Sequence, residues 1–126
     1  MANALLSQFI FKNRLRRFNY GEWDCLQMAG ELLEAYGCPN PYAKYRARYS
    51  DEFEAYKIIK REAGTLAGCI ARGFVPSNDS GIIGAVTTPK SACVLITGRH
   101  TAVGLAPMGW MSVPISNVKR RFICPL

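Results

Sequence analysis

The sequence predicts an α+β fold, in which helices of the N-terminal half pack on a small antiparallel sheet. Three observations lead to this prediction. Over the first 72 residues, apolar side chains recur at helical spacing between capping residues and glycines. From residue 92 onward, short β-branched or aromatic runs are separated by turn residues. The helices precede the strands instead of alternating with them, which favours α+β over a parallel βαβ arrangement.

Four helices are expected before the sheet. They cover residues 3–15, 24–36, 51–63 and 65–72. Ser50 and Thr65 are suitable N-caps for the third and fourth helices, and Gly37 and Gly64 are suitable ends for the second and third. Residues 42–49, between the second and third helices, are basic, aromatic and irregular.

Four strands follow, over residues 92–97, 101–106, 110–113 and 121–124. Gly98-Arg99 and Pro107-Met108-Gly109 read as the turns between the first three strands, which predicts an antiparallel meander. Residues 73–90 are rich in Gly, Ser, Pro and Asn, so we expect a loop there, with one short strand near Ile82.

The length and composition favour one globular domain over residues 1–126. A chain of 126 residues can bury one modest core, and 49% hydrophobic with 20% charged residues excludes a disordered or low-complexity chain. The longest apolar runs are a few residues, so no membrane-spanning segment is expected. The first 17 residues place their charges after their apolar residues, the reverse of a secretory signal, so we expect synthesis in a cytoplasm.

The chain is basic, with a formal net charge of +7. Such a balance favours polyanionic partners: nucleic acid, an anionic cell-wall polymer or an acidic protein surface. One basic cluster is mixed with aromatic residues and is our predicted partner surface: Tyr42, Lys44, Tyr45, Arg46 and Arg48. Because Tyr and Arg are common anchors of protein interfaces, we favour a protein partner, and nucleic acid is the least favoured class.

The cysteines do not form a metal-binding pattern. There are five, an odd number, without any C-x-x-C pair, and His100 is the only histidine. Neither a zinc site nor an iron–sulfur cluster is expected from such wide spacing, and we expect no cofactor. A disulfide framework is not expected in a cytoplasmic chain, so most of these thiols should be small buried apolar groups.

Cys25 is the candidate nucleophile. It lies in the first turn of the second predicted helix, where free backbone N–H groups and the helix dipole favour a thiolate. The available base is His100, in or beside the second predicted strand, and Thr97, Ser112 and Asn117 are alternatives for orienting its imidazole. Position alone favours a different role for Cys25, that of a small apolar residue buried at the start of the helix.

The stretch Phe18-x-Tyr20-Gly21-x-x-Asp24-Cys25 resembles the F-x-[W/Y]-G-x-x-D-C motif of a small phage and prophage family encoded among tail-assembly genes. That family is similar to the NlpC-type papain-like cysteine hydrolases, which cut peptide bonds in bacterial cell walls. The resemblance implies an NlpC-like, papain-like fold over nearly the whole chain, with Cys25 as the nucleophile.

The chain departs from the hydrolase pattern at two places. Ala102-Val103-Gly104-Leu105 matches the hydrolase strand H-V-G-I, so Ala102 occupies the position of the catalytic histidine, two residues after His100. Ser91-Ala92-Cys93 replaces the G-D-[V/L] sequence that opens the first core strand. Both departures affect the active site more than the fold, because folds persist when sites are lost.

The resemblance implies two alternative functions. The first is a phage tail component, at the tail tip or in tail assembly, located in the virion and made in the host cytoplasm, with other tail proteins as partners. The second is a cysteine peptidase that cleaves host peptidoglycan peptides during DNA delivery, with Cys25 and His100 as its catalytic pair. The sequence does not decide whether the Cys25 site is active.

Overall fold

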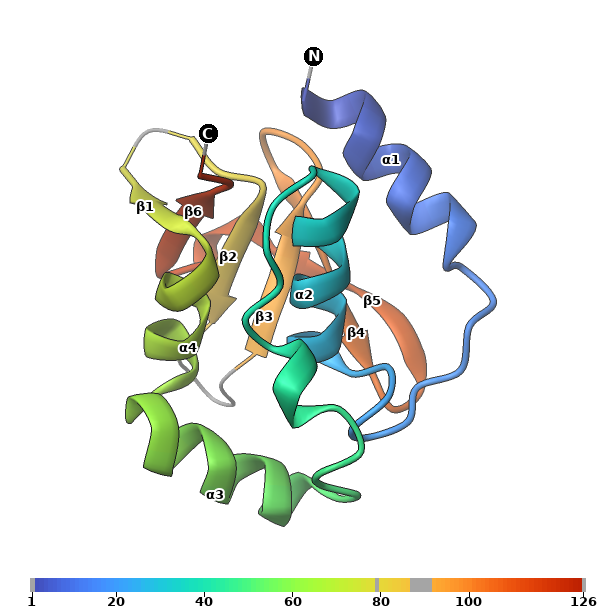
Figure 1. Cartoon of the computed structure of the whole chain (residues 1–126). Coiled ribbons are helices and arrows are strands. Elements are labelled where there is room, and N and C mark those ends of the chain that lie inside the picture. The colour runs from blue at the N-terminus through green and yellow to red at the C-terminus, as the bar shows by residue number, and fades with distance from the viewer. Residues whose placement is uncertain (1, 79, 87–91, 126) are drawn as a thin grey trace.

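The structure is α+β, as the order of the sequence patterns predicts. The computed structural model describes residues 2–78, 80–86 and 92–125. Its helices are α1 (Ala2–Lys12), α2 (Cys25–Ala35), α3 (Glu52–Ala63) and α4 (Leu66–Gly73). Two short 3₁₀ helices cover Ala43–Tyr45 and Ile115–Asn117. The strands are β1 (Val75–Ser77), β2 (Ile83–Val86), β3 (Ala92–Ile96), β4 (Thr101–Ala106), β5 (Gly109–Pro114) and β6 (Arg120–Ile123) (Figure 1).

The six strands form one antiparallel sheet with the order β1-β6-β2-β3-β4-β5. The meander β3-β4-β5 confirms the expected hairpins, and β2 confirms the short strand expected near Ile82. β6 returns between β1 and β2, so that Phe122 pairs with Pro76 on one side and with Ile83 on the other. The last strand of the chain therefore joins the first two.

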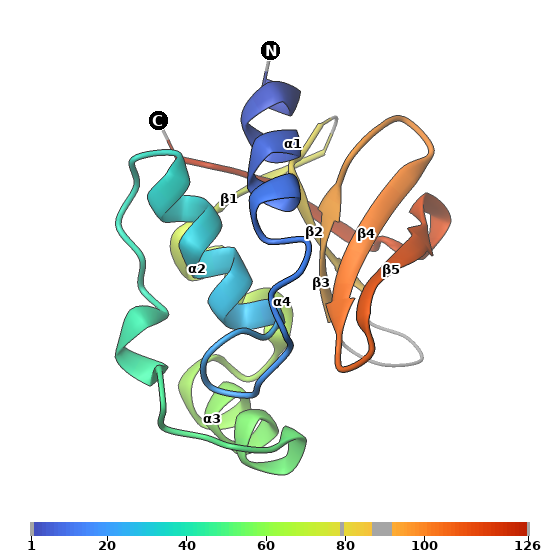
Figure 2. The same ribbon diagram turned by 90° about the vertical axis from the view of Figure 1, so that its right-hand side faces the viewer.

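The helices cover one face of the sheet (Figure 2). α2 packs on β3 and β4 and also contacts α1 and α4, while α3 lies at one end of the molecule and packs against α4. The main core lies between the two layers and includes Met28, Leu32 and Leu95. Its apolar side chains supply most of the favourable free energy of folding.

A second, smaller cluster lies on the opposite face of the sheet. It consists of Val86, Val94 and Ala102, with partly buried apolar groups from β5 and the following 3₁₀ helix packed against it. Side chains alternate between the faces of a strand, so β3 sends Cys93 and Leu95 into the main core and Val94 into the second cluster. This alternation decides which residues of the sheet can face Cys25.

Several predicted boundaries differ from those of the structure. α1 ends at Lys12, and the side-chain amide of the next residue, Asn13, donates back to the carbonyl of Phe9 (2.8 Å). Asp51, not Ser50, caps α3 by accepting from the N–H of Glu54 (2.8 Å). β1 lies in the region predicted as loop. In the described part of the chain, no helix has the length and hydropathy needed to cross a membrane.

Candidate functional site

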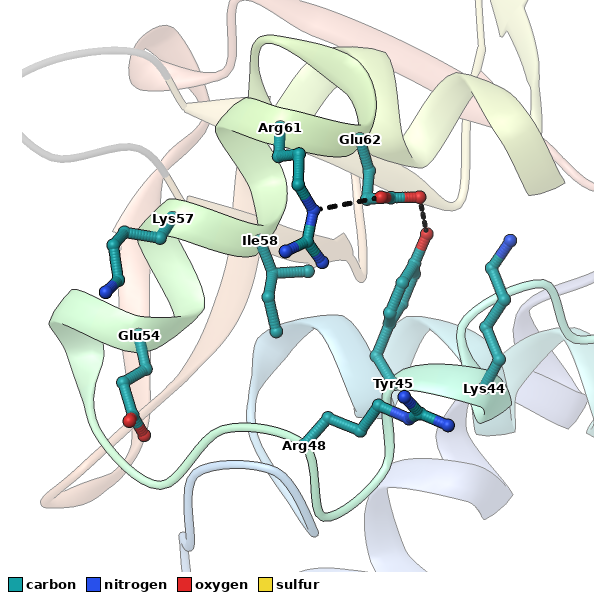
Figure 3. A pocket seen from close by; sticks show the side chains of 8 residues that line it. All are labelled: Lys44, Tyr45, Arg48, Glu54, Lys57, Ile58, Arg61 and Glu62. Atoms are coloured by element: carbon teal, nitrogen blue, oxygen red, sulfur yellow. Dashed lines mark hydrogen bonds and ion pairs between the residues drawn. The ribbon is translucent and has the colours of Figure 1, made fainter.

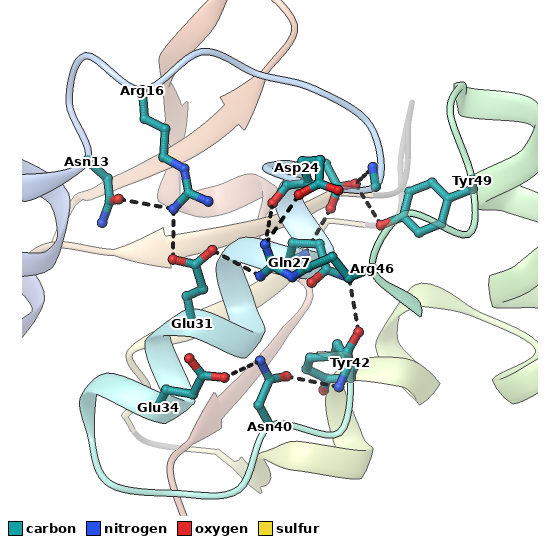
Figure 4. Close-up of polar contacts among 12 residues, drawn as sticks. Asn13, Arg16, Asp24, Gln27, Glu31, Glu34, Asn40, Tyr42, Arg46 and Tyr49 are labelled. Atoms are coloured by element: carbon teal, nitrogen blue, oxygen red, sulfur yellow. Dashed lines mark hydrogen bonds and ion pairs between the residues drawn. The ribbon is translucent and has the colours of Figure 1, made fainter. Parts of the chain in front are cut away.

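The start of α2 carries the candidate site, and Asp24 organises it. As the N-cap of α2, the Asp24 carboxylate accepts from the backbone N–H of Gln27 through Oδ1 (2.9 Å). Its Oδ2 accepts from the backbone N–H of Gly21 (2.8 Å) and from the hydroxyl of Tyr49 (2.6 Å) (Figure 4). A carboxylate that is 3% exposed thus receives three hydrogen bonds from three segments, which is how buried charges are stabilised.

Gly21 of the motif is required by the backbone. Its φ is +85°, a conformation that favours glycine, and a Cβ there would lie 2.3 Å from the carbonyl oxygen of Tyr49. The Gly21 carbonyl accepts from the N–H of Ala47 (2.9 Å). Phe18 and Tyr20 form an edge-to-face pair with ring centroids 4.8 Å apart. The motif therefore joins residues 18–25 to the segment that ends at Tyr49.

Cys25, the first residue of α2, is partly buried and lies against Cys93 at the start of β3. The Sγ of Cys93 is 2.7 Å from the backbone oxygen of Cys25. A hydrogen bond between the two thiol side chains lowers the pKa of Cys25. Burial and the Asp24 carboxylate oppose this change. The same hydrogen bond, together with burial, raises the pKa of Cys93. Cys25 is therefore the thiol of the pair that ionises first.

His100 lies at the other end of β3. It is exposed, in the turn that joins β3 to β4 and immediately before Thr101, the first residue of β4. In Figures 1 and 2 this turn is at the upper end of the sheet, whereas α2 begins at the lower end, near the start of β3. Since a strand rises about 3.3 Å per residue, the path from Cys93 to Thr97 alone spans about 13 Å. The structure does not bring Cys25 and His100 together.

The three residues considered for orienting the imidazole lie in three different parts of the fold. Thr97 shares a hydrogen bond with Thr101 (3.0 Å between the hydroxyl oxygens) in the turn of His100. Ser112 is exposed on β5, and Asn117 is exposed in the last 3₁₀ helix. Ala102 belongs to the second cluster, on the sheet face away from the helices. A histidine in its place would therefore point away from Cys25.

The predicted partner surface has to be revised. Tyr42 and Tyr45 are 1% and 7% exposed, so their rings belong to the core. The hydroxyl of Tyr42 donates to the carbonyl of Cys69 (2.6 Å), and that of Tyr45 donates to Glu62 (2.9 Å). The segment 42–49 crosses between α2 and the α3–α4 pair. Both tyrosines are buried there because their rings pack against the apolar side chains of these helices.

The three cations of this segment divide into two groups. Arg46 is half-buried and forms ion pairs with Glu31 (3.2 Å) and Glu22 (3.6 Å), which attach the segment to α2 and to the loop before it. Lys44 and Arg48 are exposed and face α3. A partner could therefore contact Lys44 and Arg48, while Arg46 has a structural role.

Sequence reasoning missed two features of the site. Cys93 is the neighbour of Cys25, 68 residues further along the chain, and no local pattern indicates this pairing. Lys57 and Arg61 complete a basic cavity with Lys44 and Arg48, and their i, i+4 spacing on α3 was the available signal. Among the described residues, no three His, Cys, Asp or Glu side chains gather in a way that could hold a metal ion.

Comparison with known proteins gives one match. No curated protein and no solved structure matches the chain. The family model described as "Domain of unknown function (DUF6950)" matches residues 2–123, and this range includes the whole motif, Cys93, His100 and all six strands. The protein therefore belongs to the DUF6950 family.

Proposed function

We propose that this protein is a bacteriophage tail component, at the tail tip or in tail assembly, built on an NlpC-type papain-like scaffold and acting without peptide cleavage. The resemblance of the Phe18–Cys25 stretch to the phage motif is the basis for the tail assignment. The observation that favours a role without cleavage is the surroundings of Cys25, which lies against a second thiol, that of Cys93, while His100 lies at the other end of β3. A papain-like reaction needs a base within hydrogen-bond reach of the nucleophile.

The contacts of the motif support this choice. Asp24 uses its carboxylate to cap α2 and to bind Gly21 and Tyr49. Gly21 allows the backbone to pass close to residue 49. These roles hold the fold together and do not depend on any reaction at Cys25, so the motif would persist in a protein that has lost, or never had, a peptidase site.

The test is to look for the protein in the particles of the phage or prophage that encodes it. We expect immunodetection of the chain in purified virions or in isolated tail intermediates, and we expect stalled tails when its gene is deleted. A Cys25→Ser variant should restore tail assembly as well as the wild type does. Absence of the protein from both virions and tail intermediates would overturn the assignment.

A peptidase that cleaves host peptidoglycan peptides is the second candidate. The lowered pKa of the partly buried Cys25 thiol, at the N-terminus of α2, is the observation that favours it. Purified protein would be incubated with peptidoglycan, and released peptides would be measured by mass spectrometry for the wild type, Cys25→Ala and His100→Ala. Cleavage that is lost in Cys25→Ala would establish the peptidase. Cleavage that persists in His100→Ala would remove His100 from the reaction.

A further inference from the structure

A basic cavity lies between α3 and the segment that follows α2 (Figure 3). Its volume is about 710 Å³. Tyr45 and Ile58 form its apolar floor, and charged side chains from both elements form its walls. The cavity is far from the turn of His100, because α3 lies at the opposite end of the molecule.

The cations of this cavity outnumber its carboxylates. Lys44, Arg48, Lys57 and Arg61 contribute four positive charges, against two negative charges from Glu54 and Glu62. Both carboxylates already have partners within the chain. Glu54 accepts from the backbone N–H and the hydroxyl of Ser50 (2.9 and 3.0 Å), and Glu62 accepts from the Tyr45 hydroxyl (2.9 Å).

Among the described residues, the cations of the cavity form fewer ion pairs and hydrogen bonds than its carboxylates do. Arg61 pairs with Glu62 at 3.2 Å, on the exposed surface. Within the ranges that the structure describes, Lys44, Arg48 and Lys57 form no ion pair. The positive charges that line the cavity therefore exceed the negative ones, and such a site attracts an anionic group.

The backbone directly before Arg48 has an unusual conformation. Ala47, directly before it, has φ +62°, the only non-glycine residue with positive φ in the described chain. The N–H of Ala47 donates to the Gly21 carbonyl (2.9 Å), which ties the turn to the motif loop. An alanine in this conformation costs free energy, and strain of this kind clusters at active sites and ligand-binding segments.

The solvent face of α3 adds apolar surface beside the cavity. Phe53 and Tyr56 are 66% and 57% exposed. Lys57 Nζ lies 5.0 Å from the centre of the Phe53 ring, and Lys60 Nζ lies 5.7 Å from that of Tyr56. Exposed aromatic rings next to unpaired cations are the composition of protein-interface anchors.

We propose that this surface binds an acidic segment of a partner protein, one that carries Asp or Glu side chains beside apolar residues. Its carboxylates would enter the cavity between Arg48 and Lys57, and its apolar residues would contact Phe53 and Tyr56. The two carboxylates of the cavity disfavour a continuous phosphate backbone, which would pass close to both. This inference rests on the proposed function, because it names the chemistry of the neighbour that a tail component would dock.

The test is a binding measurement with purified full-length protein. The probe is a short fluorescent peptide of alternating Glu and Leu. Single-stranded oligothymidylate of equal charge is measured in the same way, to represent nucleic acid. The test variant is Arg48→Gln with Lys57→Gln. The matched control is Arg17→Gln with Arg99→Gln, which removes the same charge from exposed positions outside the cavity. Circular dichroism checks that both variants fold.

We expect the peptide to bind the wild type in a salt-sensitive way, and to bind the cavity variant roughly tenfold more weakly while the control retains its affinity. Equal weakening in both variants, or no peptide binding to the wild type, would overturn the inference. Tighter binding of the oligothymidylate, lost in the cavity variant, would overturn it in favour of nucleic acid. If the peptide binds as expected but the chain is absent from virions and tail intermediates, only the tail assignment fails.

Discussion

Cys25 and Cys93 define the chemistry of this protein at the scale of single residues. The two thiols are in contact but differ in their surroundings. Cys25 begins a helix and is partly exposed, whereas Cys93 is buried in the sheet. The helix N-terminus and the Cys93 thiol both favour the Cys25 thiolate, and the neighbouring Asp24 carboxylate disfavours it. The position thus provides a nucleophile without a neighbouring imidazole.

Replacing Cys93 should make Cys25 less reactive. Cys93→Ala removes the hydrogen bond that lowers the pKa of Cys25, so this pKa should rise and the pH midpoint for alkylation by iodoacetamide should move upward. The readout is the labelling rate of Cys25 against pH, followed by peptide mass spectrometry. Cys69→Ala is the matched control, because Cys69 is equally buried but lies on α4. An unchanged midpoint in Cys93→Ala would mean that Cys93 does not influence Cys25.

At the scale of elements, the two aspartate caps differ in what they connect. Asp51 is exposed, and one backbone N–H of α3 donates to it. Asp24 is buried and joins α2, the glycine turn and the segment ending at Tyr49. The first cap serves one helix, whereas the second holds three parts of the chain at the candidate site.

This difference predicts unequal effects on stability. Asp51→Ala should cost about 1 kcal/mol in the free energy of unfolding, the usual value for losing a helix cap. Asp24→Ala should cost about 3 kcal/mol, because it also leaves the buried Tyr49 hydroxyl and the Gly21 N–H without their acceptor. Urea denaturation followed by circular dichroism measures both. Equal losses in the two variants would show that the additional contacts of Asp24 contribute nothing to stability.

Much of the element order could be predicted because it depends on local patterns. Asp24 precedes an amphipathic run, Gly64 has the positive φ (+80°) of a helix end, and the meander strands are separated by turn residues. β1 could not be predicted in this way. It has three residues, includes Pro76, and exists through its pairing with β6, nearly 50 residues later.

The candidate site was predictable only where its residues are close in sequence. The position of Cys25 at the start of α2 follows from the pattern Asp24-Cys25 before an apolar run. Cys93 is its neighbour because α2 packs on β3, and His100 is separated from it because of the direction in which β3 runs. Local sequence patterns contain neither the packing of α2 on β3 nor the direction of β3. The burial of Tyr42 and Tyr45 has the same origin, since a basic aromatic stretch reads equally well as surface or as core.

At the scale of the whole molecule, tyrosines of one segment connect the candidate site to the helical layer. Tyr49 reaches Asp24 at the start of α2, and Tyr42 reaches the carbonyls of Cys69 and Ile70 on α4. The same segment carries Lys44 and Arg48 to the basic cavity. The cavity and the Cys25 site therefore share one structural support, and loosening this segment would affect both.

This shared support predicts that the protein loses stability at alkaline pH. Burial raises the pKa of Tyr42 and of Tyr49 well above the ordinary value of 10.0, and the Asp24 carboxylate raises that of Tyr49 further. Below about pH 10 both tyrosines are protonated in the folded and unfolded states, so they add no pH dependence. Above it the unfolded chain releases protons that the folded chain keeps, so the free energy of unfolding should fall by up to about 1.4 kcal/mol per pH unit for each tyrosine. Urea denaturation across this range should show a slope that is shallower in Tyr49→Phe by up to about 1.4 kcal/mol per pH unit, because the contribution of one tyrosine is lost. Tyr56→Phe, at an exposed position on α3, is the matched control and should keep the slope of the wild type. A Tyr49→Phe slope equal to that of the wild type would mean that the folded protein lets Tyr49 ionise freely, and the segment would then not be held at Asp24 in the way described.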